Sequence, residues 1–166
     1  MRTLLSTIVV VMLMVVGCSK TGRGPLSFQF PTDWKVEHKT PGGRDFYTVT
    51  GKTPGKGLLM FSQWPPPSSP EDIPGLVQKL ADGFRERAKK SSAFALASED
   101  HRVEQFAGEH CQGSFAVFQL GSGGTNTVQA MFMMSVGRRV WNGQFTGPPD
   151  AWKQAITVLK SIKNDG

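Results

Sequence analysis

The chain has 166 residues, with 19 Lys and Arg against 13 Asp and Glu, and a formal net charge of +6. That length suits one domain with a sizeable apolar core, and the basic balance favours anionic surfaces as partners. Cys18 and Cys111 are its two cysteines, which excludes a framework of several disulfides, so the fold must rest on its apolar core.

The first element in chain order is an apolar run from Leu4 to Val16, preceded by one positive charge at Arg2. As a helix, its 13 residues would span about 20 Å, whereas the hydrocarbon core of a bilayer is about 30 Å thick. The run is therefore too short for a comfortable transmembrane helix. Its length is typical of the hydrophobic region of a signal peptide.

Gly17 and Cys18 end this apolar run abruptly. Together with Val15 and Val16 they resemble the lipobox of bacterial lipoproteins, in which aliphatic and small residues lead up to a cysteine. The resemblance implies that a diacylglyceryl group is attached to the Cys18 sulfur and that residues 1–17 are then removed as a signal peptide. Since two or more acyl chains hold a protein stably at a bilayer, we expect a membrane-anchored lipoprotein of the cell envelope. The alternative is a hydrophobic anchor with an incidental cysteine.

The residues after Cys18 add expectations about location and partners. Ser19, not Asp, follows the cysteine, and the sorting rule of lipoproteins then implies the periplasmic side of the outer membrane in a cell with two membranes. Residues 18–25 are small and polar, typical of a flexible tether, and 26–166 would form a single globular domain. The expected partners are the membrane, through the lipid on Cys18, and an envelope protein or anionic lipid. Nucleic acid is not an expected partner of an exported chain.

Four strand-like runs follow the predicted tether, and the last two are expected to form a hairpin across a Gly- and Pro-rich segment. They are residues 26–30, 34–39, 45–50 and 57–64. The apolar residues then recur at intervals of three and four, which predicts an amphipathic helix over 72–90. Asp72 is its expected N-cap.

Five more strand-like runs and a second amphipathic helix complete the chain. The runs are residues 94–98, 102–106, 109–120, 126–136 and 138–145, and the helix covers 149–163. Consecutive strands joined by short turns require antiparallel pairing. Along the run 126–136, alternation sends Met131 and Met133 to one face and Phe132 and Met134 to the other. Because both faces are apolar, this pattern predicts a central strand with a helix on each side. A methionine-lined ligand groove is the alternative role of these residues.

Together these elements predict an α+β fold, an antiparallel β-sheet of about seven to nine strands flanked by helices on both faces. The motif Phe28-x-Phe30-Pro31-x-x-Trp34, the long helix after the early strands and the closing FTGPPDAWKQAITVLKSIK resemble the PsbP-like/Mog-like superfamily, which includes bacterial lipoproteins of the DcrB type. The resemblance implies an α/β/α sandwich. It also implies a noncatalytic binding or assembly role, as in most characterised members, and carries over no site residue.

Few residues are candidates for chemistry. The alternative function is an envelope enzyme or metal-handling protein that uses His101, Glu109 and Cys111. His110 and Cys111 are adjacent on a predicted strand, so their side chains would point to opposite faces and at most one could join His101 and Glu109. The sequence has no C-x-x-C or H-E-x-x-H spacing. We therefore expect no metal, no cofactor and no catalytic residue, and a buried, unpaired thiol at Cys111.

A cluster of cations closes the first predicted helix, and we call it the α-end cluster. It consists of Arg85, Arg87, Lys89 and Lys90. In one interpretation these side chains complement the helix dipole and solvate the helix end. In the other they face an anionic partner, lipid head groups or an acidic protein, once Cys18 holds the domain near the membrane.

Overall fold

The computed structural model describes residues 18–21, 24–53, 55–65, 72–90, 95–96, 102–122 and 125–165. The predicted signal peptide 1–17 and His101 lie outside these residues. The strands are β1 (Cys18–Thr21), β2 (Leu26–Pro31), β3 (Trp34–Lys39), β4 (Phe46–Gly51), β5 (Leu58–Gln63), β6 (Ala95–Leu96), β7 (Val103–Ala107), β8 (Cys111–Ser122), β9 (Thr125–Val136), β10 (Arg139–Gly147) and β11 (Lys163–Asn164). The helices are α1 (Ile73–Lys90) and α2 (Pro149–Lys160), with a short 3-10 turn at Pro41–Gly43.

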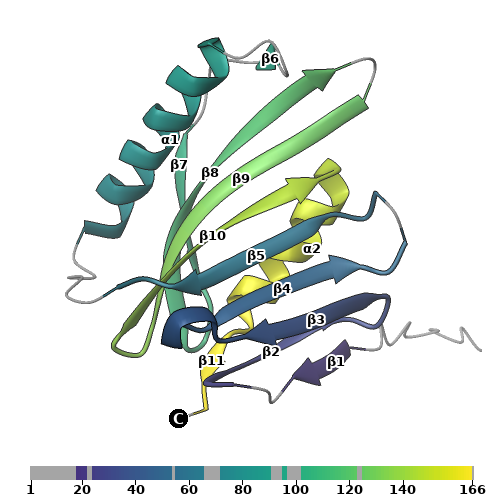
Figure 1. Ribbon diagram of the computed structural model, residues 1–166, viewed down its shortest axis with the longest axis vertical. Coiled ribbons are helices and arrows are strands. Elements are labelled where there is room, and N and C mark those ends of the chain that lie inside the picture. The colour runs from purple at the N-terminus through teal and green to yellow at the C-terminus, as the bar shows by residue number, and fades with distance from the viewer. Residues whose placement is uncertain are drawn as a thin grey trace, which may run out of the picture.

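The strands form two antiparallel sheets (Figure 1). The larger has eight strands in the order β3-β4-β5-β10-β9-β8-β6, with β7 also paired with β8. The smaller has three strands in the order β1-β2-β11. Long β8 and β9 lie in register along their whole length, from Cys111 opposite Val136 to Ser122 opposite Thr125. A two-residue turn joins β9 to β10, and its first position has a φ of 60° that favours Gly137.

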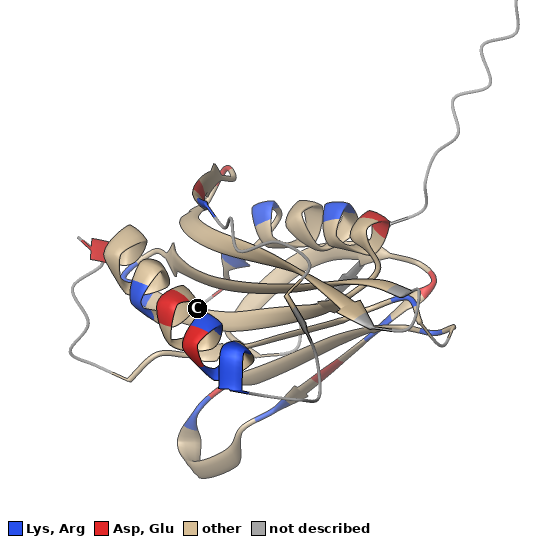
Figure 2. Cartoon of the chain, turned by 90° about the horizontal axis from the view of Figure 1, so that it is seen from above, with Lys and Arg blue, Asp and Glu red and all other residues tan. Residues whose placement is uncertain are grey.

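The two helices cover opposite faces of the large sheet (Figure 2). On one face, Phe132 and Met134 pack in a core cluster with Ala155 and Leu159 of α2. On the other face, Met131 and Met133 belong to a cluster with residues of α1. The side chains that alternate along β9 thus point to the two covered faces of the sheet, as predicted. The α/β/α sandwich predicted from the sequence is confirmed. Asp72 caps α1 as expected, because its carboxylate accepts the Gly75 N–H at 3.2 Å.

Two short strands differ from the sequence prediction. Part of the expected flexible tether, Cys18–Thr21, is strand β1 and pairs with β2. The final helix ends at Lys160 instead of 163, since Lys163–Asn164 form β11 on the other edge of β2. Both pairings satisfy backbone groups of β2 that would otherwise form open edges. None of the helices in the described ranges has the length and hydropathy needed to cross a membrane.

Candidate functional site: an open sheet face and the Cys18 end of the domain

Helix α1 covers only part of its face of the large sheet. It packs on β6, β7, β8 and β9, while β3, β4 and β5 lie beyond its edge (Figure 1). The register identifies the side chains that share this face, because directly opposed residues point the same way. Starting from Met131 under α1, the successive cross-strand neighbours are Gln144, Met60, Thr48 and Glu37. We call the part on β3, β4 and β5 the open face.

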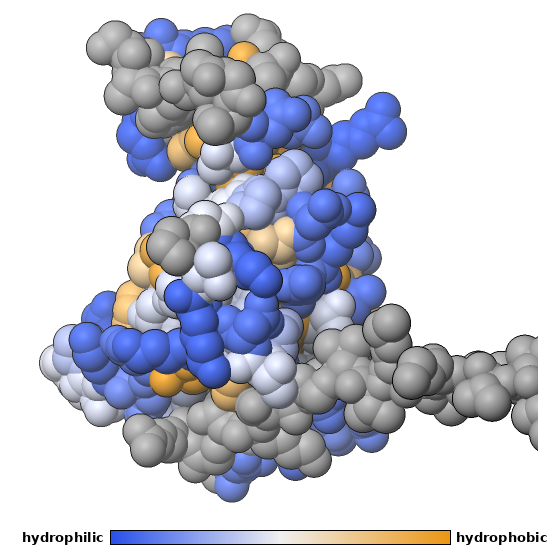
Figure 3. All heavy atoms as spheres, turned by 90° about the vertical axis from the view of Figure 1, so that its right-hand side faces the viewer, coloured by the Kyte–Doolittle hydropathy of each residue, from blue (hydrophilic) through white to orange (hydrophobic). Residues whose placement is uncertain are grey.

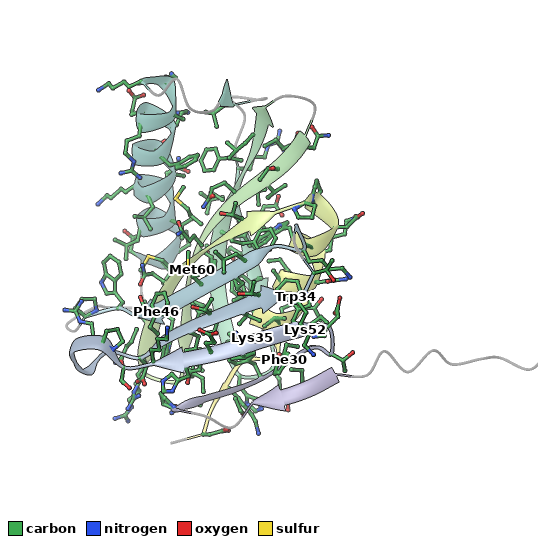
Figure 4. All side chains as sticks on the ribbon, turned by 45° about the vertical axis from the view of Figure 1, so that its right-hand side comes forward. Phe30, Trp34, Lys35, Phe46, Lys52 and Met60 are labelled. Carbon is green, nitrogen blue, oxygen red and sulfur yellow. The ribbon has the colours of Figure 1, made fainter. Side chains whose placement is uncertain are left out.

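A groove of about 250 Å³ lies where α1 borders the open face. Phe46, Met60 and Met131 line it on the sheet side, and Leu80 lines it on the helix side. Figure 4 shows Phe46 and Met60 beside the lower end of α1. Both are only half-buried. Of the methionines in the predicted methionine-lined groove, Met131 lines this groove. Met133 does not line it, because its side chain is fully buried beneath α1.

Alternating charges border the open face along the edge strand β3. Glu37 pairs with Lys35 at 2.6 Å and with Lys39 at 3.7 Å. The hydrogen bond from Lys35, and then the charges of Lys35 and Lys39, hold the pKa of Glu37 below its ordinary value. Charged side chains on an edge strand discourage the addition of a further strand. These charges therefore disfavour the pairing of a further strand with β3.

A histidine and a carboxylate meet on the opposite side of β3 and β4. His38 Nε2 lies 2.8 Å from an oxygen of Asp45, and the His38 ring stacks on Tyr47 at 4.6 Å between centroids. The Tyr47 hydroxyl accepts the Leu26 N–H at 3.1 Å, and burial raises its pKa. Gly24 packs tightly against this group, since a Cβ at this position would lie 2.5 Å from the Tyr47 hydroxyl oxygen. The group positions the start of β2.

Cys111 is buried and free, as the sequence predicts. Its Sγ–H donates to the carbonyl oxygen of Leu159 at 3.1 Å. That carbonyl lies in the last turn of α2 and also accepts the backbone N–H of Ile162 at 3.2 Å. Burial raises the pKa of the Cys111 thiol, so the reactive thiolate is scarce at neutral pH. The thiol adds one more hydrogen bond to this carbonyl at the end of α2.

We expect Cys111 to be protected from thiol reagents in the native protein. In the Cys18→Ala variant, where Cys111 is the remaining thiol, modification should be slower than in denaturant by roughly two orders of magnitude or more, because it requires local opening that costs a few kcal/mol. Denaturant should then release one equivalent. The measurement is the time course of reaction with a chromogenic disulfide reagent. Native modification as fast as in denaturant would contradict the buried position.

The residues of the alternative function are not brought together among the described residues. Glu109 is exposed and pairs with its neighbour His110 at 3.6 Å, while the Cys111 thiol points to α2. The part of the chain that the structure describes contains no group of three or more His, Cys, Asp or Glu side chains placed to hold a metal ion. His101 lies outside that part.

The α-end cluster lies far from the strand that carries Cys18. Figure 1 places the end of α1 at the top of the long axis and β1 at the bottom. Arg85 pairs with Asp82 at 3.0 Å, and Lys89 lies 4.0 Å from Glu86, whereas Arg87 and Lys90 are exposed. Figure 2 shows the blue Lys and Arg positions at this end of the helix. Contact between this cluster and a membrane at Cys18 stays a prediction that requires the long axis to lie along the bilayer.

No protein-family model matches the sequence, and no curated protein is similar to it in sequence. Among solved structures, the cyanobacterial PsbP protein CyanoP from Synechocystis is similar with a TM-score of 0.55 and 10% identity, over 96% of this chain and 98% of that one. LpqN, a protein involved in cell envelope biogenesis of Mycobacterium tuberculosis, has a TM-score of 0.45 and 12% identity over 89% of this chain and 90% of its own. A protein of Bacteroides thetaiotaomicron has a TM-score of 0.49 and 13% identity over 85% of this chain, which spans 45% of that one.

The likeness to CyanoP, which has the highest of these TM-scores, supports the PsbP-like fold predicted from the sequence. At 10% identity it concerns the fold alone. Function has to be argued from the residues of this chain.

Proposed function

We propose that this chain is a lipid-anchored protein of the cell envelope that carries a noncatalytic binding or assembly domain. In this proposal residues 1–17 are the signal peptide and Cys18 bears the lipid. The single observation that carries it is the apolar run that ends at Val16 and is followed by Gly17 and Cys18, the residue at which β1 begins. Ser19 supports an outer-membrane location on the periplasmic side in a cell with two membranes.

The open face supports the binding role. Phe46 and Met60 keep apolar surface half-exposed, and covering such surface contributes about 25 cal/mol per Å². Asn142 and Gln144 line the same groove with amide groups that can orient a partner by hydrogen bonds. Apolar anchors beside polar groups are typical of protein-binding surfaces. We infer that the partner is an envelope protein that contacts this face.

A photoreactive amino acid placed at Met60 tests this role. In intact cells, irradiation should join the protein to a discrete partner through position 60, because that side chain lines the groove. The matched control is Gln154, which is exposed on α2 on the opposite side of the sheet. The adducts are resolved by gel electrophoresis and mass spectrometry. Equal adducts from both positions, or no adduct from position 60, would contradict binding through the open face.

A further inference from the structure

Strand β1 fixes the position of Cys18 on the domain. The Cα atom of Cys18 is paired with that of Pro31, at the end of β2. Cα atoms of directly opposed antiparallel residues are about 4.5–5.5 Å apart. A chain that enters the domain from a membrane therefore reaches it beside the turn between β2 and β3, and not at the end of a loose tether.

The loop between β4 and β5 is joined to that turn by three contacts. The backbone N–H of Lys52 donates to the carbonyl of Asp33 at 2.8 Å, and its ammonium group donates to the carbonyl of Thr32 at 2.8 Å. The ammonium group of Lys56 pairs with the Asp33 carboxylate at 2.7 Å. Figure 4 shows Lys52 near Trp34, where β3 begins. We call Thr32, Asp33, Lys52 and Lys56 the lysine turn.

The lysine turn is exposed and carries positive charge. Lys52 is exposed, and the side chain of Lys56 is 49% exposed. Figure 3 views the side of the molecule to which the turn projects, and hydrophilic residues dominate it. The hydrogen bond from Lys56 lowers the pKa of Asp33, so this carboxylate stays charged and offsets one lysine. The lysine turn thus carries two cations, Lys52 and Lys56, and one anion, Asp33.

We propose that the lysine turn is the face that the domain presents to an anionic membrane, which it contacts through lipid phosphates. The proposal rests on the proposed anchor at Cys18. The anchor holds the bilayer next to this turn, within reach of electrostatic attraction, which decays over about 8 Å at physiological salt. An ammonium group has three donors, so Lys52 can keep its bond to Thr32 and still bind phosphate oxygens. In Figure 1 the α-end cluster lies at the top of the long axis, whereas the turns β2–β3 and β4–β5 project from the right-hand side of the molecule.

The experiment uses the full chain reconstituted into vesicles of phosphatidylcholine alone or mixed with phosphatidylglycerol, both containing a head-group quencher lipid. A fluorescent amino acid at Thr53, in the loop of the lysine turn, reports contact with head groups. The same probe at Glu86, in the last turns of α1, is the comparison. We expect strong quenching at Thr53, weak quenching at Glu86, and a marked loss of the Thr53 signal without phosphatidylglycerol.

Charge variants identify the residues responsible. Each cation should change the equilibrium between docked and undocked orientations roughly fivefold. Lys52→Gln with Lys56→Gln should therefore lower quenching at Thr53, and Asp33→Asn should raise it. The double variant Arg87→Gln and Lys90→Gln removes the same charge from the α-end cluster and should leave quenching at Thr53 unchanged. Equal quenching at Thr53 and Glu86, no response to phosphatidylglycerol, no effect of the lysine substitutions, or a chain that does not join either vesicle would overturn the proposal.

Failure of the lipid anchor would be recognised separately. The protein is labelled with palmitate in cells before it is purified and reconstituted, and this label reports the modification of Cys18. Quenching in the vesicles reports the orientation of the domain. If the apolar run 4–16 were the anchor instead, the chain would still enter the domain at Cys18 and the same quenching pattern is expected. If the quenching pattern is found without a palmitate label, only the proposed lipid on Cys18 is contradicted. If the palmitate label is found without the quenching pattern, only the proposed role of the lysine turn is contradicted.

Discussion

Replacing Cys18 by Ala is expected to abolish incorporation of radiolabelled palmitate and to leave residues 1–17 attached. The thiol is the group that takes the lipid in the proposed anchor, and removal of the signal peptide follows that step. The variant should therefore migrate as a longer, unlabelled chain. Its anchoring should also weaken, because burial of acyl chains contributes about 0.8 kcal/mol per CH₂ and the short apolar run replaces them. Metabolic labelling and gel electrophoresis of membrane fractions measure both effects.

The second cysteine provides the matched control for this experiment. Cys111→Ala removes a thiol that is buried against α2. It should keep the full palmitate label and the shorter, processed length. Undiminished label in Cys18→Ala, or loss of label in Cys111→Ala, would show that the acyl chains are attached elsewhere.

Truncation of Phe132 to Ala is expected to cost about 3–5 kcal/mol in the free energy of unfolding. The ring is fully buried in the central strand β9, and Phe61 lies 6.5 Å away between ring centroids. A Cβ on Gly143 would come within 2.4 Å of the ring, so the space around it is tightly filled. Strands on both sides hold β9 in place, and the site cannot collapse to fill the cavity.

Urea unfolding of the chain beginning at Cys18, followed by circular dichroism, measures this loss. Gln119→Ala, at an exposed position of neighbouring β8, is the control and should change stability by less than about 0.5 kcal/mol. A loss below about 1 kcal/mol for Phe132→Ala would mean that β9 does not form the packed centre of the sheet.

The sequence was sufficient to predict those helices and strands in which the spacing of apolar residues shows which side is buried. Alternation from Met131 to Met134 indicated both covered faces of β9, and the spacing over 72–90 predicted α1 to within one residue. The short strands β1 and β11 were missed because Cys18–Thr21 and Lys163–Asn164 have no apolar alternation. They form because β2 offers backbone partners on both edges, which is a tertiary effect.

The candidate site was predictable only where local burial decides it. Apolar neighbours on β8 correctly predicted a buried Cys111. By contrast, Phe46 and Met60 read as ordinary residues of alternating strands, since no local pattern tells which strands α1 leaves uncovered. The separation of the α-end cluster from Cys18 likewise depends on how the sheet is assembled. The link from Lys52 to Thr32 joins residues 20 positions apart and has no signal in the sequence.

Mass spectrometry of the protein purified from its own cells tests the proposed anchor most directly. Proteolysis should yield an N-terminal peptide that begins at Cys18 and carries a diacylglyceryl group in thioether linkage to its sulfur. Fragmentation of that peptide locates the added mass on the cysteine. A peptide that contains residues 1–17 joined to an unmodified Cys18, in protein recovered from the membrane, would contradict the account.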